Sequence, residues 1–212
     1  MRGVGLIRAL IVLHRTYADF ALRARLHTIV RFMTCPFLRV VRHVPAGAAV
    51  LEIGAGHGVF ATLAHAQGAG RVVAVEPDVR KVRAIDGVGM IAGYDEAVRG
   101  TFDVVAVIDV LYKVPIAEWD AMLARMAARL RPGGLLIVKE QDPTARFKNS
   151  WNRAQEWLAS RLHLTLGESF SYESPAAFTA RLERLGLTPE PPHRIDRWYP
   201  HPHVLYLARK LV

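Results

Sequence analysis

Three glycines and two acidic residues have a spacing that suits an adenosine-containing ligand. Gly54, Gly56 and Gly58 stand at every second position directly after an apolar run, and Glu52 lies two residues before the first of them. Such glycines let the backbone turn tightly and approach a ligand, and a helix that follows them offers free N–H groups. Glu76 ends the next apolar run. A carboxylate there can accept hydrogen bonds from both hydroxyls of a ribose without a 2′-phosphate.

This spacing differs from that of dinucleotide-binding proteins. Their fingerprint is G-x-G-x-x-G, and its third glycine would fall at Val59. The pattern here is an acid followed by G-x-G-x-G. Together with Glu76, it predicts an adenosine-type ligand other than a dinucleotide.

Alternating strand and helix patterns must position these residues. Buried strands are predicted at 49–53, 71–75, 89–92, 102–108 and 135–138, with helices at 59–67, 79–85, 118–130 and 175–185. Strands separated by helices imply βαβ units, a parallel sheet and right-handed crossovers. The elements therefore predict an α/β fold.

Residues 44–212 resemble a class I S-adenosylmethionine-dependent methyltransferase. Glu52 and the three glycines match the family's first motif, and Glu76 matches the acid that holds the ribose. The resemblance implies a Rossmann-like, doubly wound, seven-stranded sheet, mostly parallel with an antiparallel last strand, with N-terminal amphipathic helices added. Residues 187–196 and 204–210 would form the closing antiparallel pair. The implied cofactor is S-adenosyl-L-methionine.

The same resemblance assigns a set of cofactor-binding positions. The glycine loop would contact the methionine end, Asp95 would lie near the adenine, and Asp109 would end the strand that flanks the sulfonium methyl. The predicted cofactor-binding residues are Glu52, Gly54, Ala55, Gly56, Gly58, Glu76, Pro77, Asp95 and Asp109.

The chemistry of methyl transfer is modest in its demands. A sulfonium methyl is already activated, so the protein must align acceptor and methyl and exclude water. A base is needed only for an acceptor that keeps its proton until late. Glu140 and His203 are the candidate catalytic residues, although Glu140 could instead cap a turn and His203 could simply belong to a hairpin. The sequence requires no metal.

The acceptor is predicted to be a small molecule of hydrophobic, aromatic or lipid-like character. Residues 141–173 are rich in large apolar side chains and form either a lid over the ligand edge or a local core. The candidate substrate-binding residues are Tyr112, Trp151, Tyr199 and His201. The alternatives are an RNA-modifying methyltransferase and a non-catalytic cofactor-binding protein of the same fold.

The positive charge is concentrated at the N-terminus. The chain holds 28 Lys and Arg against 19 Asp and Glu, for a net charge of +9. Residues 1–43 carry eight arginines and one acid, which is +7, and residues 44–212 carry the remaining +2. We therefore divide the chain into a basic arm, 1–43, and a methyltransferase domain, 44–212. The near balance of the domain disfavours nucleic acid as a partner.

The arm has the pattern of an amphipathic helix followed by a second piece that ends near Cys35. Its predicted apolar stripe is Leu6, Leu10, Leu13, Tyr17, Phe20 and Ala24. The arm could pack over the domain, form one wall of a substrate entrance, or lie on an anionic membrane surface. No run is apolar enough for a membrane span or signal peptide. We expect a cytoplasmic enzyme, with peripheral membrane association if the arm binds lipid.

Overall fold

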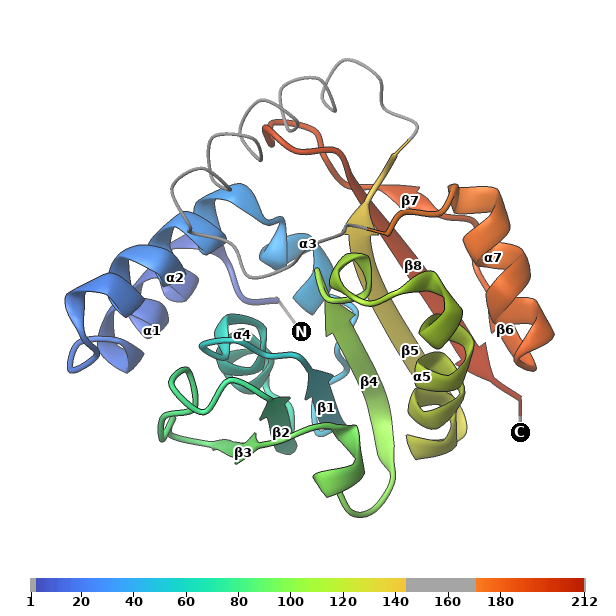
Figure 1. Ribbon diagram of the computed structural model, residues 1–212. Coiled ribbons are helices and arrows are strands. Elements are labelled where there is room, and N and C mark those ends of the chain that lie inside the picture. The colour runs from blue at the N-terminus through green and yellow to red at the C-terminus, as the bar shows by residue number, and fades with distance from the viewer. Residues whose placement is uncertain (1–2, 144–170, 212) are drawn as a thin grey trace.

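The computed structural model describes residues 3–143 and 171–211. One sheet forms the middle layer, with helices on both of its faces (Figure 1). Its strands are β1 (Ala49–Ile53), β2 (Arg71–Glu76), β3 (Val88–Ala92), β4 (Phe102–Ile108), β5 (Leu130–Gln141), β6 (Leu187–Pro189), β7 (His193–Arg194) and β8 (His203–Lys210).

The strand order is β3-β2-β1-β4-β5-β8-β6. β1 to β5 pair in parallel, while β8 is antiparallel to β5. β6 and β7 both pair with the outer edge of β8, so the sheet is seven positions wide. The predicted α/β fold, with a mostly parallel sheet and an antiparallel last strand, is confirmed.

Each face of the sheet has its own hydrophobic core because side chains alternate along a strand. Val50, Val104 and Leu205 face α4 (Val59–Gln67) and the arm. Leu51 and Val105 face α5 (Ile116–Arg129) and α7 (Pro175–Arg184). Burial on both faces explains why these strands are continuous apolar runs.

The predicted helix at 79–85 is wrong. Residues 79–81 form a turn, and Ile85 makes an isolated bridge to Val88. The side chain of Asp78 accepts hydrogen bonds from the backbone N–H and the guanidinium of Arg80. This local bonding offers the backbone an alternative to the helix.

The arm contains three helices, α1 (Leu6–Thr16), α2 (Leu22–Thr34) and α3 (Phe37–Val41). Leu13 and Tyr17 are buried as the sequence predicts, together with Ala9, in the same core as α4. Leu6 and Leu10 are instead 57% and 47% exposed, so the predicted stripe is only partly correct. The chain leaves the helix after Thr16, and one continuous apolar face therefore cannot form.

No helix in the described residues is both long enough and apolar enough to cross a bilayer.

Candidate functional site

A cleft of about 970 Å³ opens at the carboxyl ends of β1, β2 and β4. In doubly wound sheets this is the edge at which ligands bind. We call one side of the cleft the loop side, formed by the glycine loop 54–58, residues 76–78 at the end of β2, and the short 3-10 helix η1 (Asp95–Ala97). The arm side is formed by His27, Arg31 and Phe37, together with the turn that follows β4.

The glycine loop needs its glycines for two reasons. Gly54 and Gly56 have φ angles of 72° and 58°, in the left-handed region that side chains disfavour. A Cβ on Gly54 would also lie 2.5 Å from Cγ2 of Val110. The loop therefore packs directly against the turn after β4, and this contact joins the two sides of the cleft.

Glu76 holds the glycine loop in place. Its Oε2 accepts a hydrogen bond of 2.7 Å from the N–H of Gly56, and its Oε1 accepts one of 3.1 Å from the N–H of Asp78. A carboxylate has about four acceptor positions, so both oxygens retain capacity for further donors. Glu76 lines the cleft at the end of β2, where the sequence predicted it.

Glu52 lies deeper and supports α4. Its Oε2 accepts a 3.0 Å hydrogen bond from the N–H of Ala61, in the first turn of that helix, where backbone donors lack helical partners. Burial raises the pKa of Glu52 to about 8. Glu52 thus fixes the helix that follows the glycine loop.

Asp95 is held by a residue that sequence reasoning missed. Arg125 of α5 donates to both oxygens of the Asp95 carboxylate, at 2.7 and 3.3 Å. The sequence offers no local signal for this pair because its members are 30 residues apart. Both residues line the cleft at the far end of the loop side.

Asp109 lies between two cations at the end of β4. Its Oδ1 accepts a 2.5 Å hydrogen bond from Nζ of Lys139 on β5, and its Oδ2 accepts one of 2.7 Å from Nη1 of Arg31 on α2. Burial opposes ionisation, but the charges of Lys139 and Arg31 hold the pKa of Asp109 well below its usual range. Asp109 also has a φ of 57°, which turns the chain sharply into the cleft.

The arm side is attached to the body by a further hydrogen bond and by a contact between two histidine rings. The hydroxyl of Tyr17 donates to the carbonyl oxygen of His57 in the glycine loop, at 2.7 Å. His27 and His57 meet edge to face across the cleft, with ring centroids 5.3 Å apart. Burial, together with the charges of His57 and Arg31, lowers the pKa of His27 to about 4. This wall of the cleft is therefore neutral at His27 and positive at Arg31.

Residues 26–191 match the family model described as a methyltransferase domain. The chain belongs to this family. The match begins inside the arm, at the helix that supplies the arm side of the cleft. The resemblance to class I S-adenosylmethionine-dependent methyltransferases is confirmed, and S-adenosylmethionine is the cofactor of this methyltransferase. No curated protein sequence matches the chain significantly.

Solved structures of other methyltransferases share the fold. One is a Haloferax volcanii methyltransferase in complex with the Trm112 methyltransferase activator, with a TM-score of 0.69, 15% identity, and coverage of 94% of this chain and 98% of that one. Another is the 1,6-didemethyltoxoflavin-N1-methyltransferase of Burkholderia thailandensis, with a TM-score of 0.65, 18% identity, and coverage of 100% and 93%. A third is magnesium protoporphyrin IX methyltransferase of Synechocystis. It has a TM-score of 0.61 and 18% identity, and the match covers 95% of this chain and 94% of that one.

The methyltransferase buries both predicted catalytic residues near Asp109. Oε1 of Glu140 accepts hydrogen bonds from the N–H groups of Val110 and Leu111, at 3.0 and 2.8 Å. Burial and the charge of Asp109 raise the pKa of Glu140. Because Glu140 lies beneath the turn and is not among the cleft-lining residues, its contacts favour positioning of that turn. A catalytic role for it stays a prediction.

His203 links the sheet to the arm. Its Nε2 lies 2.8 Å from the carbonyl oxygen of Thr34 at the end of α2, which makes this nitrogen the donor. Burial and the charge of Lys139 lower the pKa of His203 to about 3. Among the described residues, its Nδ1 has no hydrogen-bond partner. A neutral imidazole that holds α2 in place fits this geometry, and a catalytic role for it also stays a prediction.

The predicted substrate-binding residues lie in different places. Tyr112 lines the cleft and stacks on Tyr172, with centroids 6.2 Å apart. Tyr199 and His201 surround His203 in the β7–β8 hairpin and are not among the residues that line the cleft. Trp151 and most of the predicted lid, 144–170, lie outside the described residues. Of the three candidates that the structure describes, it brings Tyr112 alone to the cleft.

Proposed function

We propose that this methyltransferase transfers the methyl group of S-adenosylmethionine to a small hydrophobic, aromatic or lipid-like acceptor. The observation that carries the proposal is the difference between the two sides of one cleft. The loop side offers glycines and the Glu76 carboxylate, while the arm side offers the rings of Phe37 and Tyr112 beside Arg31 and Lys113. The loop side is thus suited to hydrogen-bond a polar ligand, and the partly apolar arm side across from it is suited to a second, less polar ligand.

The loop side fits the cofactor. The spare acceptor capacity of Glu76 suits the two ribose hydroxyls, and the absence of a side chain at Gly54 leaves the backbone open to close approach. We assign the methionine end to the loop 54–58, including Ala55, and the adenine end to the neighbourhood of Pro77 and Asp95. The cofactor supplies an activated methyl group.

The arm side would orient the acceptor and keep water away from it. Asp109 is fixed between Arg31 and Lys139, so it contributes a stationary charge and does not take up a proton. Lys113 also lines the cleft, and burial lowers its pKa. Alignment of the acceptor against the methyl group is then the main contribution of the protein, in keeping with a donor that is already activated.

The names of two structural neighbours agree with a small-molecule acceptor. One acts on magnesium protoporphyrin IX and another on 1,6-didemethyltoxoflavin. The arm adds support for a lipid-like acceptor and a peripheral membrane location, because α1 and α2 both expose large aliphatic side chains.

The test is transfer of a labelled methyl group from S-adenosylmethionine to fractionated cell extract. We expect label in the lipid or small-molecule fraction with the wild-type enzyme and with Glu183→Ala, an exposed glutamate of α7. Glu76→Ala should give little label in any fraction. Label that appears mainly in RNA or protein would contradict the proposed acceptor class.

A further inference from the structure

α2 presents a continuous apolar stripe to solvent. Leu22, Leu26, Ile29 and Met33 are spaced four, three and four residues apart, which places them on one face of the helix. Together with Val30 they are between 54% and 69% exposed. A different face, through Thr28 and Phe32, is the one that α2 buries. A helix of a soluble domain normally buries its apolar face, so this stripe requires a partner.

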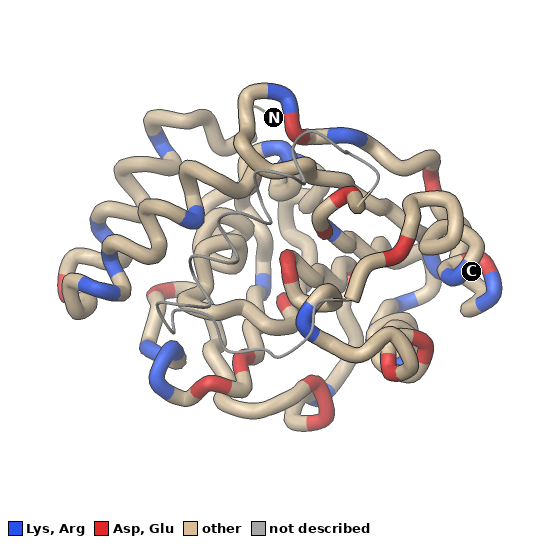
Figure 2. The backbone as a smooth tube through the Cα atoms, turned by 45° about the horizontal axis from the view of Figure 1, so that its top comes forward, with Lys and Arg blue, Asp and Glu red and all other residues tan. Residues whose placement is uncertain are grey.

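α1 extends the apolar surface and adds positive charge. Ile7 is 76% exposed and Ile11 47% exposed. The same helix carries Arg8 and Arg15, and α2 carries Arg23 and Arg25. Within the described part of the chain, none of these four arginines takes part in an ion pair. Figure 2 shows the basic residues distributed along both arm helices. The surface is therefore aliphatic and cationic together.

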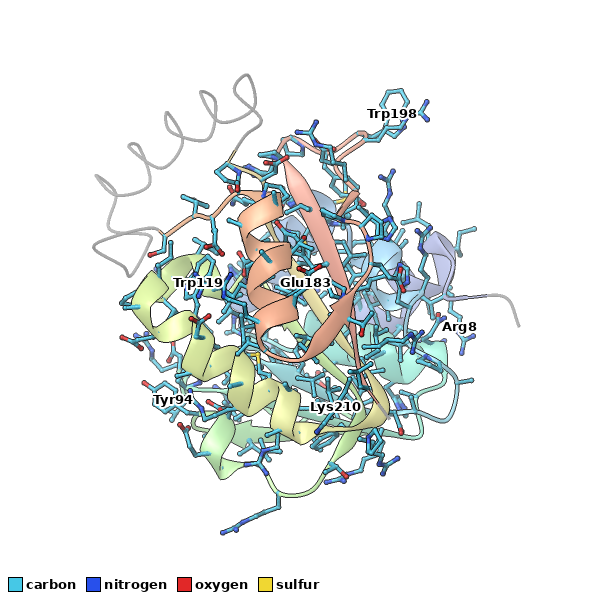
Figure 3. All side chains as sticks on the ribbon, turned by 90° about the vertical axis from the view of Figure 1, so that its right-hand side faces the viewer. Arg8, Tyr94, Trp119, Glu183, Trp198 and Lys210 are labelled. Atoms are coloured by element: carbon cyan, nitrogen blue, oxygen red, sulfur yellow. The ribbon has the colours of Figure 1, made fainter. Side chains whose placement is uncertain are left out.

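Trp198 is a second exposed anchor at the same end of the molecule. It is 86% exposed, and Figure 3 shows its side chain projecting away from the fold. Arg39 of α3 holds this hairpin by donating to the carbonyl oxygens of Ile195 and Arg197, at 3.1 and 3.0 Å. Figure 1 places the β7–β8 hairpin and α2 on the side of the molecule on which the parallel strands end.

We propose that the apolar stripe of α2, the arginines of α1 and α2, and Trp198 dock the enzyme on an anionic lipid surface. Aliphatic side chains flanked by arginines match the acyl and headgroup layers of such a surface, and tryptophan favours their boundary. A second copy of the chain would bring arginine against arginine, which opposes self-association through this face. Nucleic acid would leave the aliphatic side chains exposed.

Docking would bring the lipid surface next to the cleft. The helix that carries the stripe also supplies His27 and Arg31 to the arm side, so an acceptor dissolved in the lipid has a short path inward. This purpose of the surface, delivery of a lipid-like acceptor, rests on the proposed function, whereas the docking itself is measured independently of activity.

The experiment is co-sedimentation of the full-length enzyme with phosphatidylcholine vesicles, with and without phosphatidylglycerol. Wild-type enzyme should bind the vesicles that contain phosphatidylglycerol, and added salt should weaken binding. Leu26→Ser/Met33→Ser should lower the partition coefficient by about tenfold or more, because two exposed apolar side chains are lost. The matched control is Val79→Ser/Leu211→Ser. Both side chains are 67% exposed and lie outside the arm.

The contributions of the arginines and of Trp198 are measured with the same vesicles. Arg15→Gln/Arg23→Gln should weaken binding to anionic vesicles, whereas Arg83→Gln/Arg184→Gln, at exposed positions elsewhere, should not. Vesicles should shift the tryptophan emission of the wild type to shorter wavelength, and Trp198→Phe should reduce that shift. Thermal stabilisation by S-adenosylhomocysteine should be equal in all variants, which separates failure of docking from failure of the cofactor site.

Three results would overturn the proposal. The first is no binding of the wild type to anionic vesicles. The second is equal loss in the stripe and control variants. The third is a dimer, seen by analytical ultracentrifugation, that Leu26→Ser/Met33→Ser abolishes, since the stripe would then belong to a second copy of the chain.

Discussion

The two sides of the cleft are built in different ways. Most of the loop side is local in sequence, since β1, the glycine loop, α4 and β2 occupy a continuous stretch and Glu76 accepts a hydrogen bond from Gly56 only 20 residues away. Its far end is the exception, because Asp95 is held by Arg125 of α5. The arm side is assembled over long distances, because Arg31 meets Asp109 over 78 residues and His203 meets Thr34 over 169. Local construction suits a cofactor that a whole family shares, and long-range construction leaves the arm side free to differ between members.

Glu76→Ala should have the largest effect, and only on the loop side. We expect affinity for S-adenosylhomocysteine to fall about 100-fold or more, because hydrogen bonds to a charged group contribute about 1.5–3 kcal/mol each. Isothermal titration calorimetry measures this. The control Glu183→Ala should bind as the wild type does. Unchanged affinity in Glu76→Ala would contradict the assignment of the cofactor to the loop side.

Asp109→Asn tests the charge cluster at the base of the arm side. Lys139 is fully buried and would lose its counter-charge, so the free energy of unfolding should fall by about 3–5 kcal/mol. Asparagine accepts a positive φ readily, which leaves the backbone unstrained. Urea denaturation gives the value, with exposed Asp86→Asn as the control. A loss no greater than that of Asp86→Asn would mean that the cluster does not stabilise the fold.

His203 should make the arm attachment sensitive to acid. Its pKa is about 3 in the folded protein, below the ordinary value of 6.5, so the unfolded chain binds more protons between these values. Stability from this group is complete above pH 6.5 and is lost as the pH falls. From pH 7.5 to pH 5 the loss is about 2 kcal/mol.

His203→Gln should remove that part of the acid sensitivity, and the exposed His193→Gln should not. Urea denaturation at the two pH values gives the comparison. The same pH dependence in His203→Gln and in the wild type would contradict a neutral, buried imidazole at this position.

Tyr17→Phe should have the smallest effect, because it removes one hydrogen bond between the arm and the glycine loop. The Tyr17 hydroxyl is buried and donates to His57, so we expect a loss of about 1 kcal/mol in unfolding free energy. Affinity for S-adenosylhomocysteine should change little, since the other contacts of the loop remain. A large loss of affinity would show that the arm controls the loop side.

The sequence predicted the strands and helix around the glycine loop well for physical reasons. Glycines at alternate positions and an acid at the end of a strand have meaning within one short segment, and buried parallel strands are conspicuous apolar runs. The strands 49–53 and 102–108 and the helix 59–67 lie as predicted. The helix expected at 79–85 failed because the bonding of Asp78 to Arg80 is not visible in apolar periodicity.

The arm side was predicted less well because its contacts depend on tertiary structure. The excess of arginines was evident, but nothing in the local sequence distinguishes Arg31, which binds Asp109, from the exposed Arg23. The buried apolar stripe that the sequence predicted between residues 6 and 24 was also wrong in part. Leu6 and Leu10 are exposed, while Ala9 is buried, because packing against α4 selected a different face of α1.

Hydrogen–deuterium exchange of the full chain, with and without S-adenosylhomocysteine, tests most directly whether the two sides form one cleft. The ligand should slow exchange at residues 54–58 and 76–78 on the loop side, and to a smaller extent at 27–31 on α2. Protection at both segments is the predicted result. Unchanged exchange at 54–58, or protection there with none at 27–31, would contradict a cofactor cleft walled by the arm.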